Sequence, residues 1–255
     1  MLDCGLGGHH GMSSGVLRDA AQTFRPRADE RHGPLVPMMV ALTVLTGLVD
    51  AVSYLQLGHV FVANMTGNVV FLGFAIAGAA GLSAVASLLA LASFILGALA
   101  GGWLSARNAA HRGRLLRAAT AVQAALILLA LLIALLAREP PQKSVRYELI
   151  VALALAMGVQ NAAALRLSVP ELTTTVLTRT LTGIASQARI VGGSGSHSGR
   201  RGVAVVAMLL GALTGALLVL HVSIAAAIAL AFALSVALAV AAGAISGSSA
   251  SWTRS

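Results

Sequence analysis

The stretch VFVANMTGNVVFLGFAIAGAAGLSAVASLLALASFILGALAGGWLSA, residues 60–106, contains no Asp, Glu, Lys, Arg or His. A single helix crosses the hydrocarbon core of a bilayer with about 20 residues, so this stretch must turn back at least once. The sequence Gly-Ala-Ala-Gly at 78–81 is the expected turn, because glycine often ends helices and forms turns. The stretch therefore predicts a chain that crosses a membrane several times.

The composition of the whole chain leads to the same prediction. Hydrophobic residues make up 58% of the chain and charged residues 10%, and the net charge is +9. A soluble domain carries about 25% charged residues. The composition excludes an ordinary soluble enzyme, a nucleic-acid-binding protein and a disordered chain. The lipid bilayer is the expected partner, and the basic residues are expected to gather on the cytoplasmic side.

Charged residues mark the edges of six predicted spans. These are 35–57, 82–104, 117–137, 147–165, 202–220 and 222–244. Two further segments, 60–79 and 171–191, are ambiguous, because the first carries two Asn and a Thr and the second is rich in Thr and contains Arg179. Irregular backbone is tolerated at membrane depth where protein buries it, so each segment either re-enters or spans. The predicted fold is an all-α polytopic bundle of six to eight helices.

The distribution of basic residues favours six spans. If both ambiguous segments re-enter, only Arg138, Lys143 and Arg146 fall on the side opposite the N-terminus. If both segments span, the basic residues divide more evenly. The positive-inside rule then predicts a protein of the bacterial cytoplasmic membrane with both termini in the cytoplasm. Eight spans remain the alternative, because 60–79 is strongly apolar.

We expect a transmembrane domain between two disordered tails. The predicted ranges are 1–33 for the cytoplasmic N-terminal tail, 34–245 for the transmembrane domain and 246–255 for the C-terminal tail.

The two halves of this domain, 35–137 and 147–245, resemble each other. Three sequence pairs recur in the same order at a nearly constant offset: GLVDAVSYL from Gly47 with GVQNAAALR from Gly158, MTGN from Met65 with LTRT from Leu177, and LGALAG from Leu96 with LGALTG from Leu210. We therefore predict an internal duplication. With three spans per half the second copy would be inverted, which is a common plan in transporters, and with four spans it would be parallel.

The few polar side chains inside the apolar spans are the candidate functional residues. Burying a carboxylate is costly, so Asp50 should face a cavity or a partner, or be protonated. Asp50 shares a helix face with Thr43, Gly47 and Tyr54. We interpret it as part of a solute or proton site, with a hydrogen-bonded anchor between helices as the alternative. The full set of predicted substrate-binding residues is Asp50, Asn64, Thr66, Asn68, Gln160, Asn161 and Thr178.

Amides suit a site for a polar solute, because they both donate and accept hydrogen bonds. Asn64 and Asn68 are four residues apart and would project together from a helix, although helix packing uses the same residue types. Asn161 corresponds to Asp50 in the repeat, so the two would lie near the symmetry axis. The patterns Gly97-xxx-Gly101 and Gly211-xxx-Gly215 predict a close internal contact between the halves.

Sequence motifs for catalysis and metal binding are absent, so we predict no enzymatic activity, no metal and no cofactor. The chain also lacks an ATP-binding domain. Any transport would therefore be passive or ion-coupled. The oligomeric state is left open.

Several of these segments together carry a family resemblance. VDAVSYL, VFVANMTGN, MGVQNA and TTTVLTRTLTG resemble the YoaK family of bacterial multipass membrane proteins, which carry a domain of unknown function (number 1275). The resemblance covers about residues 35–245. It implies an integral bacterial membrane protein, and it marks Asp50, the segment 63–68 and the segment 157–162 as family positions. Arg179 departs from the family, which usually has Gly or another uncharged residue there.

The sequence thus predicts a transporter-like permease for a small solute, with proton coupling as an option. The alternative is a structural or accessory membrane protein without transport activity.

Overall fold

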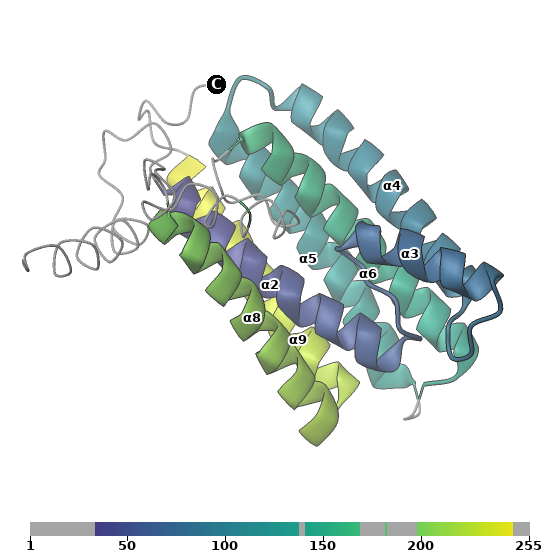
Figure 1. Ribbon diagram of the computed structural model, residues 1–255. Helices are drawn as coiled ribbons and strands as arrows, with labels where there is room; N and C mark the ends of the chain where they lie inside the picture. The colour runs from purple at the N-terminus through teal and green to yellow at the C-terminus, as the bar shows by residue number, and fades with distance from the viewer. Residues whose placement is uncertain (1–33, 138–140, 169–181, 183–197, 247–255) are drawn as a thin grey trace, which may run out of the picture.

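The computed structural model describes residues 34–137, 141–168, 182 and 198–246, and in these ranges the chain is helical, with no strand (Figure 1). The helices are α2 (Leu35–Gln56), α3 (Met65–Ile76), α4 (Ala84–Arg107), α5 (Arg112–Leu136), α6 (Lys143–Leu167), α8 (Ser198–His221) and α9 (Ile224–Ser246). The all-α prediction is confirmed. The predictions for the two tails, and those for Thr178 and Arg179, lie outside the described residues.

Six of these helices are long and apolar enough to cross a membrane, namely α2, α4, α5, α6, α8 and α9. Each has at least 22 residues, and at 1.5 Å per residue even the shortest is about 33 Å long, against a hydrocarbon core of about 30 Å. Helix α3 has 12 residues and is therefore only about 18 Å long. The ambiguous segment 60–79 thus contains a short helix that cannot span, as the six-span arrangement requires.

Helix ends are set by local signals in the sequence. The turn between α3 and α4 contains Gly78 and Gly81, whose φ angles of +89° and +81° are strained for other residues, so the turn predicted at 78–81 is confirmed. Helix α4 then begins after Ser83, whose hydroxyl accepts a hydrogen bond from the N–H of Ala86 at 3.2 Å.

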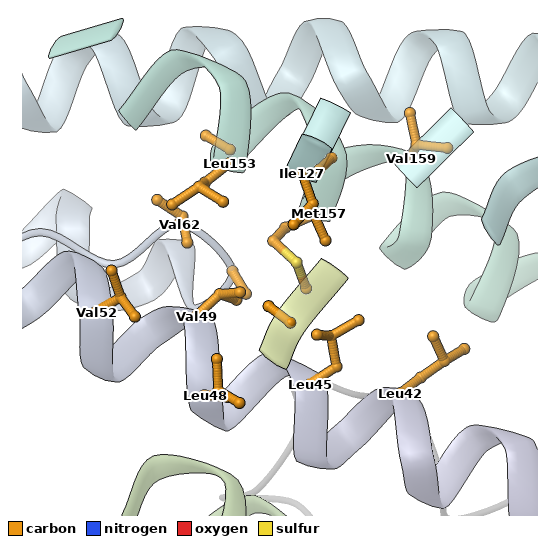
Figure 2. Close-up of a cluster of buried hydrophobic side chains, with 14 of the residues drawn as sticks. Leu42, Leu45, Leu48, Val49, Val52, Val62, Ile127, Leu153, Met157 and Val159 are labelled. Atoms are coloured by element: carbon orange, nitrogen blue, oxygen red, sulfur yellow. The ribbon is translucent and has the colours of Figure 1, made fainter. Parts of the chain in front are cut away.

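Helix α2 runs through the middle of the bundle. Figure 1 shows α8 on one side of α2 and the group α4, α5 and α6 on the other, and α9 packs against α5. Large apolar side chains of α2 and α6 form the centre of the core, with Leu45, Leu48, Leu153 and Met157 fully buried (Figure 2). The two halves of the chain therefore share one core.

Basic residues of the described ranges gather at one end of the bundle. There the Arg112 guanidinium donates a hydrogen bond to the carbonyl of Leu167, which joins the start of α5 to the end of α6. The basic residues at this end are Arg107, Arg112, Arg114, Arg117, Arg166, Arg200 and Arg201. Only Lys143 and Arg146 lie at the other end of the described helices. The cytoplasmic assignment of the arginine-rich end stays a prediction.

Glycines bring two pairs of helices into backbone contact. A Cβ atom on Gly47 would lie 2.3 Å from the carbonyl oxygen of Met208, so α2 and α8 touch. A Cβ atom on Gly158 would lie 2.2 Å from the carbonyl oxygen of Phe94, so α6 and α4 touch in the same way. Neither glycine can carry a side chain unless its helix pair moves apart.

Both GxxxG patterns lie on the partner helices of these contacts, α4 and α8. Gly97 and Gly101 of α4 face α6, and Gly211 and Gly215 of α8 face α2. Each pattern thus joins a helix of one half to a helix of the other half, as the sequence predicted.

Candidate functional site

Asp50 holds the connection between α2 and α3 in place. One carboxylate oxygen accepts hydrogen bonds from the N–H groups of Val62 at 2.9 Å and Ala63 at 2.8 Å, and the other accepts from the side-chain amide of Asn64. Asp50 is 3% exposed. The carboxylate therefore satisfies buried backbone donors that would otherwise lack a partner.

Asn68 completes this connection from the first turns of α3. Its side-chain oxygen accepts from the N–H of Phe61 at 2.8 Å, and its amide donates to the carbonyl of the same residue at 2.6 Å. The Asn68 side chain is fully buried. The two asparagines of the ANMTGN segment thus hold the same loop in place, Asn64 by its bond to Asp50 and Asn68 by its bonds to Phe61.

The segment from Leu57 to Asn64 re-enters the bundle. Val60, Val62 and Ala63 are at most 1% exposed, and Figure 2 draws Val62 in one cluster with Val49, Val52 and Leu153. Asp50 lies six residues before the end of α2, so the segment returns about 9 Å along the helix. Such irregular backbone is tolerated at membrane depth because Asp50 and Asn68 bind its polar groups.

A second set of buried polar side chains meets α2 one helical turn from Asp50. The Gln160 amide of α6 donates to the Thr46 hydroxyl at 2.9 Å, and the Gln123 amide of α5 donates to the Gln160 side-chain oxygen. The Thr46 hydroxyl in turn donates to the carbonyl of Leu42 at 2.9 Å. Thr46, Gln123 and Gln160 are all at most 2% exposed. We call these three residues the amide cluster.

One acceptor of the amide cluster is left open. No described residue donates a hydrogen bond to the side-chain oxygen of Gln123, although this atom is buried. A buried acceptor without a donor costs about 1–3 kcal/mol. Buried polar atoms are normally satisfied, so a donor such as water or a polar solute is expected at this oxygen.

The structure places the predicted site residues in two groups and leaves two of them, Thr66 and Asn161, outside both. Asp50, Asn64 and Asn68 come together at the re-entrant segment, whereas Gln160 belongs to the amide cluster. Thr66 is exposed on α3. The Asn161 amide donates to the carbonyl of Met157 in its own helix at 2.9 Å.

Gln123 is the residue that the sequence analysis missed. It lies in the span 118–137, where Thr120 is the one other polar residue, and a polar residue in an apolar span is the kind of signal that singled out Asp50. The absence of charged residues alone identifies the span but not the glutamine inside it. A search of the apolar spans for uncharged polar side chains, as well as for charged ones, would find Gln123.

The described residues contain no group of three or more His, Cys, Asp or Glu side chains that could hold a metal ion. The side chains of the amide cluster and the re-entrant segment can donate and accept hydrogen bonds, and Asp50 can also carry a charge or a proton. This chemistry suits recognition of a polar solute.

Comparisons with known proteins agree on one family. The family model described as "Protein of unknown function (DUF1275)" matches residues 38–241. The chain is also similar to the UPF0700 transmembrane protein YoaK of Bacillus subtilis (strain 168), with 35% identity over 146 residues, which is 56% of this chain. The matched part spans 63% of the length of that relative. No solved structure gives a significant match.

Proposed function

Because the chain belongs to the DUF1275 family of membrane proteins, whose description names no activity, we propose its function from the fold and from the buried polar groups. The proposal is a transporter-like permease that moves a small polar solute across the membrane. It has no enzymatic activity in this proposal.

The packing of α2 against α8 and of α6 against α4 carries the proposal. Gly47 of α2 meets Met208 and Ala212 of α8, and the equivalent Gly158 of α6 meets the positions of α4 that correspond to them in the sequence match, Phe94 and Ala98. The correspondence supports an internal repeat.

The GxxxG glycines follow the same correspondence. Gly97 of α4 meets Leu155 of α6, and its counterpart Gly211 of α8 meets Val44 of α2. The positions on α6 and α2 are themselves counterparts in the repeat, so the two helix pairs repeat one arrangement.

An odd number of spans per half makes the two copies run in opposite directions. Within the described ranges, three apolar spans, α2, α4 and α5, precede residue 140, and three, α6, α8 and α9, follow it. Inverted halves with a site between them near the middle of the bilayer are a recurrent transporter plan. Each helix pair also joins one half to the other.

The amide cluster is the proposed solute site. Thr46 and Gln123 belong to the first half and Gln160 to the second, so the cluster lies between the halves. Thr46 is 11 residues from the start of α2, about 16 Å along the helix, which is near the middle of a 30 Å core. The open acceptor of Gln123 would take a donor of the solute. We assign any proton coupling to Asp50, one turn away.

A structural or accessory role is the second candidate function. It is favoured by the hydrogen bonds of Asp50 and Asn68, which go to the connection between α2 and α3 and need no solute. In that role the polar side chains only fix the helices and the re-entrant segment.

Cysteine labelling separates the two functions without knowledge of the solute. In a Cys4→Ser background, Thr46→Cys places a thiol in the amide cluster, and Ala154→Cys places a control thiol on α6 at a site that is also fully buried. A permease must expose its site to water, so Thr46→Cys should react with a membrane-impermeant thiol reagent added to one side of sealed vesicles. Ala154→Cys should stay unreactive. If both thiols stay protected from both sides, the permease is excluded.

A genetic experiment tests the site itself. In a strain that lacks the gene, the metabolite profile should be restored by the wild type and by Ser53→Ala, a buried change outside the cluster. The double variant Gln123→Leu/Gln160→Leu should fail to restore it at equal protein level. Restoration by this variant would remove the amide cluster as the solute site.

A further inference from the structure

A shallow groove runs between α5 and α9 on the outside of the bundle, with a volume of about 520 Å³. Its lining residues are Arg117, Ala121 and Ala124 on α5 and Val236, Ala239, Val240 and Gly243 on α9. On each helix the spacing is three or four residues, so the lining forms one continuous face of that helix. The groove exists because most of these side chains are small. It is separate from the amide cluster in the core.

Arg117 lies at one end of this groove. Its side chain passes over Gly243, since a Cβ atom there would lie 3.7 Å from Arg117 Cδ and 3.8 Å from Nε. The residue is exposed, and no residue of the described ranges forms an ion pair or a side-chain hydrogen bond with its guanidinium. Larger side chains at position 243 would close this path. The groove thus combines an apolar floor with a positive charge that no described residue neutralises.

The depth of the groove matches one leaflet of the bilayer. Arg117 lies five residues from the start of α5, about 7 Å along the helix, and Ala124 lies 12 residues from it, about 18 Å. Val236 lies ten residues from the end of α9, about 15 Å. Half of a 30 Å hydrocarbon core is about 15 Å. The charge is therefore near the level of lipid head groups, and the apolar floor ends near the middle of the membrane.

We propose that this groove binds one anionic phospholipid, with its phosphate at Arg117 and an acyl chain along the apolar floor. An arginine fork pairs well with phosphate oxygens. A lipid tail fits a groove that stops at mid-membrane, whereas a partner helix is about 10 Å wide and would continue across the whole bilayer. The lipid belongs to the leaflet on the arginine-rich end of the bundle.

The experiment uses the full-length protein in detergent, with dioleoyl phosphatidylglycerol and dioleoyl phosphatidylcholine as probes and native mass spectrometry as the readout. Arg117→Gln removes the charge, and Arg114→Gln is its control, an exposed arginine of the same helix outside the groove. Ala239→Leu fills the floor, and Ala241→Leu is its control, an exposed alanine of α9 outside the lining.

The wild type should retain phosphatidylglycerol in preference to phosphatidylcholine. Arg117→Gln should bind phosphatidylglycerol roughly fivefold more weakly, because one basic residue near a membrane surface contributes about that factor. Ala239→Leu should also lose the bound lipid, while both controls should behave as the wild type.

Three results would overturn the proposal. Equal retention of the two lipids would show that the charge plays no part. Equal losses in Arg117→Gln and Arg114→Gln would indicate diffuse attraction to a basic surface. A dimer that Ala239→Leu dissociates would show that a second copy occupies the groove instead.

Discussion

Asp50 accepts hydrogen bonds from two buried backbone N–H groups and from the Asn64 amide, so its removal should lower the stability of the fold. In Asp50→Ala, the N–H groups of Val62 and Ala63 lose their acceptor, at about 1–3 kcal/mol for each buried unsatisfied group. We expect a clearly lower thermal unfolding temperature in detergent. Asp50→Asn should lose less, because one side-chain oxygen can still accept from both N–H groups.

Ser53→Ala is the matched control for Asp50. Ser53 is fully buried on the same helix, but its hydroxyl only donates to the carbonyl of Asp50 at 3.1 Å. Its removal should change the unfolding temperature little. Equal effects of Ser53→Ala and Asp50→Ala would contradict a stabilising role for the carboxylate.

The two glutamines of the amide cluster should be energetically coupled. Gln160→Leu leaves the Gln123 amide without its acceptor in a fully buried site, so we expect a loss of about 1–3 kcal/mol in the free energy of unfolding. The double variant Gln123→Leu/Gln160→Leu removes both partners and should cost less than the sum of the single changes. A double-mutant cycle from denaturation in detergent measures this difference, and additive effects would argue against the contact.

The sequence predicts that Asp50 and Gln160 are special, but it does not predict their partners, and the reason is physical. Asp50 is conspicuous because a carboxylate in an apolar span always needs an explanation. Its main partners are backbone N–H groups 12 and 13 residues away, which no residue type reveals. Gln160 and Asn161 are neighbours in sequence but point about 100° apart on a helix, so only one of them can reach Thr46.

Among the contacts between helices, the close approaches at glycines should be the most sensitive to substitution. In Gly211→Ala, the new Cβ atom would lie 2.0 Å from the carbonyl oxygen of Val44, so α8 and α2 must separate. Overpacking of this kind costs about 1–3 kcal/mol. We expect a lower unfolding temperature than in the wild type.

Gly202→Ala tests whether the effect comes from the contact. Gly202 lies on the same helix α8, and a Cβ atom there would meet nothing within 4 Å. Alanine is favoured over glycine in a helix by about 1 kcal/mol, so this variant should be neutral or slightly more stable. A loss in Gly202→Ala as large as in Gly211→Ala would mean that helix propensity, not packing, controls both sites.

The spans could be predicted more reliably than the segment between them. Their edges follow from charge and length, so each lies within a few residues of its prediction, as with α4 at Ala84–Arg107 against 82–104. Segment 60–79 is as apolar as a span, and hydropathy alone cannot shorten it. Its re-entrance depends on hydrogen bonds that its backbone N–H groups donate to Asp50 and Asn68, which are tertiary contacts.

For the whole molecule, the sequence predicted a close contact between the two halves, but not which helices would make it. Matching LGALAG with LGALTG places α4 and α8 in equivalent positions, and their glycines do face equivalent positions on α6 and α2. The pairing across halves was only partly foreseeable, because a GxxxG pattern shows that a helix approaches another closely but not which one.

The six-span topology predicts a definite pattern of sidedness for three exposed positions. In a Cys4→Ser background, we expect His59→Cys and Ala80→Cys to react alike with a membrane-impermeant maleimide in intact cells, and Ala110→Cys to behave oppositely. The reason is that α3 lies between the first two positions and, at about 18 Å, is too short to cross, whereas α4 crosses before residue 110. If the segment 60–79 spanned instead, His59→Cys and Ala110→Cys would react alike and Ala80→Cys would differ. That result would replace six spans with a larger number and, with four spans per half, make the two copies parallel.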